Sequence, residues 1–204
     1  HGHHRRQRQM CIRDSPILVA GSTHDLEEEA VLQAGKDLWQ KSPSLKVIIV
    51  PRHPERFDAV AKLIEAKSLP FVRSSQVKSV PDDTNVVLLD EMGKLNDAYA
   101  VASFAFVGGS IADKGGHNAL EPASFSIPII MGPHTYNNPV ICSYLEECGA
   151  LIKVEGGEAM SAIVNSWLLN PNERKKAGQA GRQVLEENSG ALEATVQCIR
   201  KYVN

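Results

Sequence analysis

The stretch FAFVGGSIADKGGHNALEPA, residues 104–123, places a short apolar run before two pairs of glycines and a polar segment. The apolar run FAFV has the length and composition of a buried strand, and the segment that begins near Asn118 has the pattern of a helix. A strand that ends in glycines and leads into a helix is the repeating unit of α/β sheets. This stretch therefore predicts a parallel sheet covered by helices.

The same alternation of strand and helix patterns continues along the chain from Pro16 onward. The predicted strands are Ile17–Ala20, Lys46–Val50, Phe71–Arg73, Val86–Leu89, Phe104–Val107, Pro128–Met131 and Leu151–Val154. The predicted helices are Leu26–Gln40, Glu55–Ala66, Leu95–Val101, Asn118–Phe125, Asn138–Cys148, Ala159–Leu169 and Asn172–Glu187, with a last helix near Ala191–Tyr202. This order predicts one α/β domain, a Rossmann-like doubly wound parallel sheet without internal repeats or a linker, whose C-terminal third is helical.

The overall composition excludes several classes of protein. The chain has 204 residues, of which 43% are hydrophobic, and its 22 basic and 24 acidic residues leave a net charge of −2. This charge offers no general attraction to nucleic acid or to an anionic membrane, so any anion must be bound locally. The four cysteines form no C-x-x-C pair, which favours a reduced setting, and no apolar run approaches the roughly 20 residues that span a bilayer.

The first fourteen residues, HGHHRRQRQMCIRD, carry three histidines and four arginines and show no apolar period. We interpret residues 1–14 as a leader of foreign or disordered origin and assign the domain to residues 15–204. The alternative is a basic arm that contacts acidic lipid or nucleic acid. The segment contains no aromatic residue and joins no basic patch in the rest of the chain, which disfavours that alternative.

Four loops are the candidates for a binding site. Ligands of doubly wound sheets bind outside the carboxyl ends of the strands, where the strand order reverses. The loops that follow the first, second, fourth and fifth predicted strands are Gly21–Asp25, Pro51–Glu55, Asp90–Lys94 and Gly108–His117. They are also the loops richest in glycine and in hydrogen-bonding side chains.

The loop GGSIADKGGHN matches neither the Walker A pattern nor GxGxxG. Its glycines would let backbone N–H groups approach a ligand, and the start of the following helix would favour an anion such as phosphate. A plain turn that uses glycine for positive φ is an equal alternative. Asn118 and Glu121 share one face of the first helical turn, where Glu121 could accept hydrogen bonds from a sugar or complement the helix dipole.

The loop VPRHPERF holds Arg52 and His53 between Pro51 and Pro54, which restrict the backbone on both sides. An arginine held in this way suits bidentate contact with a phosphate. The alternative is a solvated arginine paired with Glu55. For His53, a packed or capping role is the stronger interpretation.

The remaining loops carry weaker signals. In GSTHDLEEE, Asp25 and Glu28 have the spacing of a capping box, while Ser22, Thr23 and His24 lie where a ligand could touch them. The loop DEMGKL could present backbone groups to a base edge or simply turn the chain. His134 in GPHTYNN is a candidate for contact with a substrate carboxylate. The sequence singles out no Ser-His-Asp or Cys-His set in these loops, and no cluster of carboxylates suggests a metal site.

Taken in order, PRHPERF, the MG of DEMGKL, FVGGS, GGHNALEPA and GPHTYN resemble the C-terminal half of the bacterial 3-deoxy-D-manno-octulosonic acid (Kdo) transferases. The resemblance covers nearly everything from Pro16 to the end of the chain. It implies a glycosyltransferase of the GT-B architecture, in which two Rossmann-like halves enclose the active site in the cleft between them.

The family resemblance also implies a reaction. The C-terminal half binds the donor CMP-Kdo, while an N-terminal half binds the lipid A precursor (lipid IVA), carries the membrane anchor and supplies a glutamate as general base. Transfer is inverting and independent of metals or other cofactors, and it serves lipopolysaccharide biosynthesis at the cytoplasmic face of the inner membrane. This chain lacks the N-terminal half, so alone it is expected to be soluble, to bind CMP weakly and to transfer nothing.

The resemblance assigns the CMP contacts to residues of three loops, and it places no catalytic residue in this chain. The expected contacts are Pro51, Arg52, Met92, Gly93, Lys94, Asn118, Ala119, Leu120 and Glu121. Looser candidates are Ser22, Thr23, His53, Gly109, Ser110, Gly116, His117 and His134. Two positions depart from the family pattern. Lys94 replaces a usual glutamate, which leaves a backbone role there, and Leu26 replaces a common glycine.

Three other interpretations remain open at this point. The first is a GT-B donor half that uses a UDP-sugar, and the second is a nucleotide-binding or scaffolding module without catalysis. The third is a metal-dependent transferase, which would need a D-x-D pair that the candidate loops do not contain.

Overall fold

The structure, a computed structural model, describes residues 15–203, with side chains as far as Asn188. The predicted leader, residues 1–14, lies outside the described residues. Seven strands form one parallel sheet in the order β3-β4-β2-β1-β5-β6-β7. Their bounds are β1 Ile17–Thr23, β2 Lys46–Pro51, β3 Phe71–Arg73, β4 Val86–Leu88, β5 Phe104–Val107, β6 Ile129–Met131 and β7 Leu151–Lys153.

The strand order reverses next to β1. From β1 the chain moves to β2 and on to β3 and β4 at one edge, then returns to place β5 on the other side of β1. Both β2 and β5 pair with β1 in parallel, so the carboxyl ends of β1 and β5 lie side by side. This is the topological switch point at which sheets of this class bind ligands.

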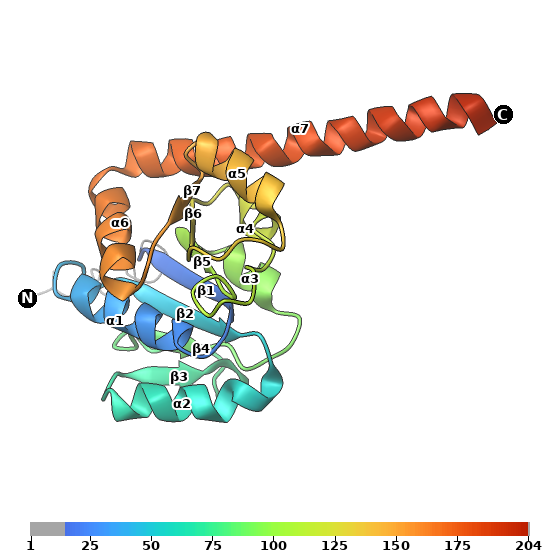
Figure 1. Cartoon of the computed structure of the whole chain (residues 1–204). Helices are drawn as coiled ribbons and strands as arrows, with labels where there is room; N and C mark the ends of the chain where they lie inside the picture. The colour runs from blue at the N-terminus through green and yellow to red at the C-terminus, as the bar shows by residue number, and fades with distance from the viewer. Residues whose placement is uncertain (1–14, 204) are drawn as a thin grey trace, which may run out of the picture.

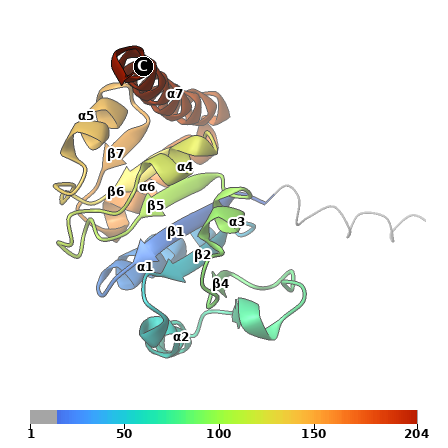
Figure 2. The ribbon, with the colours of Figure 1, turned by 90° about the vertical axis from the view of Figure 1, so that its right-hand side faces the viewer.

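Helices cover both faces of the sheet (Figure 1). One face carries α1 Glu27–Trp39, α2 Phe57–Ala66 and α6 Gly157–Leu169, which pack on strand residues such as Leu18 and Phe106. The other face carries α3 Leu95–Tyr99, α4 Leu120–Ser124, α5 Pro139–Glu147 and α7 Pro171–Val203. Figure 2 views the molecule from the side on which α3 and α4 lie. Two short 3₁₀ helices lie in loops, η1 Pro54–Arg56 before α2 and η2 Ser74–Gln76 after β3.

The strands form where the apolar runs predicted them, because both faces of a doubly wound sheet are buried. All four residues of FAFV in β5 are buried, with Phe104 and Phe106 on one face and Ala105 and Val107 on the other. The α/β class and the doubly wound sheet are thereby confirmed.

The two C-terminal helices expected at Asn172–Glu187 and near Ala191–Tyr202 are one continuous helix, α7. The polar and glycine residues 188–190 between the two predicted helices do not interrupt α7, since an isolated glycine within a helix costs only about 1 kcal/mol. Figure 1 shows α7 passing over the β6–β7 side of the sheet and extending beyond it. Within residues 15–203, no helix is both long and apolar enough to cross a membrane.

Candidate functional site

The loop after β1 enters α1 through a left-handed residue. Leu26 has φ 71° and its side chain is 70% exposed, so the family's usual glycine would meet the same backbone requirement without a Cβ. The predicted capping box is wrong, because no side chain caps α1. Asp25 instead pairs with Arg56, and Glu28 is buried and accepts hydrogen bonds from Thr23 Oγ1 at 2.9 Å and Arg56 Nη2 at 3.0 Å.

A buried carboxylate, Glu27, organises the glycine-rich loop after β5. Its Oε1 accepts hydrogen bonds from the N–H groups of Ser110 and Ile111, both at 2.9 Å, and from Ala112 at 3.3 Å. Its Oε2 accepts from the N–H groups of Gly109 at 2.8 Å and His24 at 2.9 Å. The side chain is fully buried, so these bonds replace the water that a carboxylate requires.

The first glycine pair therefore does not present free N–H groups to an anion. The expectation that its backbone would cradle a phosphate is wrong at Gly109 and Ser110, because Glu27 already occupies these donors. The Ser110 hydroxyl is buried as well, donating to Val107 O at 2.6 Å and accepting from Gly132 N at 2.7 Å. Thr23 is likewise fully buried, with its hydroxyl bound to Glu28.

Glycine is required here because the loops after β1 and β5 touch. A Cβ on Gly108 would lie 2.2 Å from the carbonyl oxygen of Ser22, a backbone atom that cannot move aside. Gly109 has φ 72°, and a Cβ there would lie 2.9 Å from the ring of His117. Ser22 has φ 54° at an irregularity in the β1–β2 register, which turns the chain toward the loop after β5.

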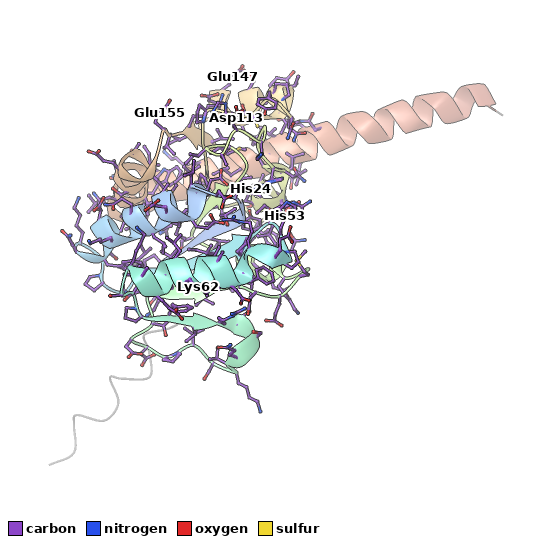
Figure 3. All side chains as sticks on the ribbon, turned by 60° about the horizontal axis from the view of Figure 1, so that its bottom comes forward. His24, His53, Lys62, Asp113, Glu147 and Glu155 are labelled. Carbon is purple, nitrogen blue, oxygen red and sulfur yellow. The ribbon has the colours of Figure 1, made fainter. Side chains whose placement is uncertain are left out.

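Three histidines from three different loops meet at this point. His24 Nε2 and His117 Nε2 are 2.8 Å apart, and their rings stack with centroids separated by 5.1 Å. The ring of His53 meets that of His24 edge-on at 5.5 Å, and Figure 3 shows these two side chains close together. Burial lowers the pKa of both His24 and His117, and neighbouring cationic groups lower it further.

Arg52 follows β2 and stands beside this histidine cluster. Its N–H group donates to Thr23 O at 3.0 Å, which ties the loops after β1 and β2 together, while its side chain is exposed. The side chain forms no ion pair with any residue that the structure describes, so the interpretation that pairs it with Glu55 is wrong. Burial is the first cause that lowers the pKa of His117, and the charges of His24 and Arg52 lower it further. Pro51 is buried at the end of β2.

Asn118 and Glu121 lie on one face at the start of α4, as their spacing predicted. Asn118 Nδ2 lies 3.4 Å from Glu121 Oε1, and Asn118 Oδ1 accepts from the N–H of Leu120 at 3.0 Å. The helix is shorter than predicted and begins at Leu120. Within the described part of the chain, the N–H groups of Asn118 and Ala119 have no acceptor, which leaves two donors next to His117.

The loop after β4 lies two strands away from β1 in the sheet. Gly93 has φ 78°, the Met92 side chain is 59% exposed and Lys94 Nζ is 3.3 Å from Asp97 Oδ2. A surface pocket of about 270 Å³ opens beside this loop between the sheet and α3, and Leu89 and Ala98 contribute to its apolar wall.

A second pocket, of about 350 Å³, opens directly beside His24. It lies between the loops after β1 and β5, with Leu26 and Ile111 as apolar walls and Arg56 and Lys114 as cationic ones. Neither Lys114 nor Arg56 was predicted from the sequence. The pairing of Arg56 with Glu28 could not be predicted, because the sequence does not show how η1 lies against α1.

The loop after β6 supports the glycine-rich loop from the other side. His134 N–H donates to Ser110 O at 3.0 Å, and His134 Nδ1 lies 3.3 Å from Asp113 Oδ1. Gly116 has φ 75°, and a Cβ there would meet Met131 at 2.7 Å. His134 therefore contacts the glycine-rich loop through Ser110 and Asp113.

The site as a whole thus joins the loops after β1, β2 and β5 at the switch point. Among the side chains that the structure describes, no group of three or more histidine, cysteine, aspartate or glutamate residues could hold a metal ion. The fold brings an exposed arginine, a coupled imidazole pair and unpaired backbone donors to one place, which is an arrangement suited to binding an anion.

Comparisons with known proteins identify the family. The sequence profile of the family "Glycosyl transferases group 1" matches residues 27–184. The "3-deoxy-D-manno-octulosonic acid transferase" of Haemophilus influenzae is 39% identical over 197 residues, covering 96% of this chain and 46% of that protein. The enzyme of the same name from Aquifex aeolicus is 35% identical over 169 residues, covering 82% of this chain and again 46% of that protein. The chain thus spans about half the length of these relatives.

Solved structures agree with the sequence comparison. The "C-terminal CMP-Kdo binding domain of WaaA from Acinetobacter baumannii" matches with a TM-score of 0.81 and 31% identity, covering 87% of this chain and 93% of that domain. Sucrose-phosphate synthase from Thermosynechococcus elongatus, at 15% identity and a TM-score of 0.61, shares the fold. The chain therefore belongs to the group 1 glycosyltransferases and, among them, to the 3-deoxy-D-manno-octulosonic acid transferase family, where it corresponds to the C-terminal domain.

Proposed function

We propose that this chain is the donor-binding half of a Kdo transferase and binds CMP-Kdo at the switch point of its sheet. The observation that carries the proposal is the match to a solved domain named for CMP-Kdo binding, over 93% of that domain's length. The exposed Arg52 and the polar loops after β1 and β5 lie where that fold class binds its ligands.

The proposed contacts divide between the parts of CMP. The Arg52 side chain and the N–H group of Asn118 would hold the phosphate, since both belong to exposed residues and neither has a partner among the described residues. Glu121 would accept hydrogen bonds from the ribose, and backbone groups of Met92–Lys94 would read the cytosine edge. The glycines would then shape the site, because Glu27 already takes the loop's N–H groups.

The proposed reaction is a direct displacement. An acceptor hydroxyl of the lipid A precursor forms a bond to the anomeric carbon of Kdo while the bond from that carbon to the phosphate oxygen breaks. CMP leaves with the electron pair, configuration inverts, and the proton of the hydroxyl passes to a base on an acceptor-binding half. The departing phosphate gains charge in the transition state, and a donor fixed in advance, such as Arg52, stabilises it without a metal.

The acceptor site and the membrane contact are proposed to belong to the part of the relatives' length that this chain does not span. On this proposal the purified chain binds the donor and transfers nothing. Transfer of Kdo to lipid A precursor by the purified chain alone would contradict it.

The experiment replaces Arg52 by alanine in a full-length enzyme that contains this chain. Loss of one electrostatic donor should lower the rate of transfer by roughly 10²–10³. Arg182→Ala is the matched control, because Arg182 lies on α7 and contacts Glu186 and Ser124, away from the switch-point loops. Unchanged transfer by the Arg52 variant would favour a nucleotide-binding module without a catalytic role.

A further inference from the structure

Among the side chains that the structure describes, no acid neutralises one cation of the pocket beside His24. Lys114 is exposed at this pocket and forms no ion pair with any side chain that the structure describes. The two acids of the pocket are both engaged, since Asp25 pairs with Arg56 and Asp113 lies 3.3 Å from His134 Nδ1. The pocket therefore presents an ammonium group to whatever enters it.

The imidazole pair forms the inner side of the same region. His24 lines the pocket, and its Nε2 is 2.8 Å from Nε2 of His117. The framework sets this contact, because a single oxygen of Glu27 accepts hydrogen bonds from the N–H of His24 and from the N–H of Gly109, against which the His117 ring packs. The two rings are thus held together by the fold rather than by a ligand.

The pair is arranged to gain a proton when an anion arrives. At 2.8 Å one ring nitrogen must donate and the other accept, so the ligand-free pair shares a single N–H. Burial comes first in lowering the pKa of each ring. For His24, the facing groups His53 after β2, Lys114 after β5 and Arg56 of η1 act in the same direction. For His117, His24 after β1 and Arg52 and His53 after β2 do so. Glu27 of α1 opposes them. A bound anion would also raise the pKa values of the two rings and so favour the pair that carries one extra proton and one positive charge.

We propose that Lys114 and the His24–His117 pair form a subsite for the carboxylate of the donor's sugar acid. This inference rests on the proposed function, in which the donor is an ester of CMP with an octulosonic acid. In a 2-ulosonic acid the carboxylate is attached to the anomeric carbon, which also bears the phosphate oxygen. A carboxylate subsite must therefore adjoin the phosphate site.

The geometry satisfies this requirement. His117 directly precedes Asn118, whose N–H is a proposed phosphate donor, and the N–H of Arg52 donates to the carbonyl oxygen of Thr23, the residue before His24. His24, whose ring contacts that of His117, lines the pocket together with Lys114. On this proposal, a phosphate at Arg52 and Asn118 would have the sugar and its carboxylate on the side of the pocket, whose apolar wall is formed by Leu26 and Ile111.

The test compares CMP with CMP-Kdo as ligands of this 204-residue chain, since the related domain was crystallised by itself. Isothermal titration at pH 7 in two buffers of different ionisation enthalpy measures both affinity and proton uptake. Neither the phosphodiester nor the carboxylate of CMP-Kdo titrates near neutrality, so any proton taken up binds to the protein. The variants are Lys114→Met and His24→Asn, and Lys62→Met on the exposed face of α2 is the control (Figure 3).

The subsite predicts that Lys114→Met lowers affinity for CMP-Kdo about tenfold, the value of one charge-assisted hydrogen bond, and that for CMP less than about twofold. CMP-Kdo binding should take up a fraction of one proton in the wild type, and His24→Asn should abolish this uptake. The inference is overturned if both variants weaken CMP and CMP-Kdo equally, or if wild-type binding takes up no proton. Preference of the wild-type chain for UMP over CMP would instead contradict the proposed function itself.

Discussion

Replacing Glu27 by glutamine tests the buried carboxylate that joins the loops after β1 and β5. The substitution keeps the size of the side chain but leaves one acceptor oxygen where there were two. If that oxygen takes the place of Oε1, it still serves Ser110 and Ile111. The new NH₂ group then faces the N–H groups of His24 and Gly109, which lose their acceptor.

The expected loss of stability follows from these two donors. A buried donor left without a partner costs about 1–3 kcal/mol, so the free energy of unfolding should fall by roughly 2–6 kcal/mol. This is a large part of the roughly 5–15 kcal/mol that stabilises a typical domain. The opposite orientation of the amide is worse, because it leaves the N–H groups of Ser110, Ile111 and Ala112 unpaired.

Urea unfolding at pH 7, followed by circular dichroism, measures this loss. Glu29→Gln is the matched control, because Glu29 lies on the same helix but is exposed and pairs with Lys67 at the surface. Such a pair contributes about 0–1 kcal/mol. The reasoning is refuted if Glu27→Gln costs less than about 1 kcal/mol, or no more than the control, because the carboxylate would then not hold the loop.

Three further predictions concern stability. Leu26→Gly should raise the free energy of unfolding by about 0.5–1 kcal/mol, since relief of the left-handed conformation outweighs the added chain entropy. The control is Leu169→Gly in α6, where the leucine is equally exposed but helical, and this change should lower the free energy of unfolding. A loss of stability at both positions would contradict the prediction. Gly108→Ala should cost about 3 kcal/mol or more in urea unfolding, because its Cβ would collide with Ser22 O, and a cost below about 1 kcal/mol would show that the loops separate easily. Burial opposes ionisation of Asp90, but hydrogen bonds from Ser75, Arg73 and Ser74 hold its pKa at about 2, below the ordinary 3.8. The resulting stability is present above about pH 4 and lost as the pH falls toward 2, so Asp90→Asn should flatten the pH dependence of unfolding in that window, and an unchanged slope would exclude Asp90 as its source.

The sheet was predictable because its chemistry is local. Runs such as FAFV and VIIV are apolar along their whole length, which fits strands buried on both faces, and the bounds of each predicted strand lie within three residues of those observed. The candidate loops could be located for the same reason, since glycine and polar residues collect at the carboxyl ends of these strands.

The hydrogen bonds and ring contacts within the site were not predictable from local patterns. A glutamate in the first turn of a helix normally complements the dipole, and nothing near Glu27 indicates that it reaches donors more than 80 residues away. The contact of His24 with His117 likewise depends on β1 and β5 being neighbours. The capping box failed because Leu26 in the left-handed region turns Asp25 away from α1 toward Arg56.

The most direct test of the account is a calorimetric titration of this chain with CMP, UMP and UDP. If the switch-point loops form a CMP site, CMP binds, either uridine nucleotide binds at least about tenfold more weakly, and Arg52→Ala weakens CMP binding. Equal or tighter binding of a uridine nucleotide would contradict the account and identify the chain as a donor half for UDP-sugars.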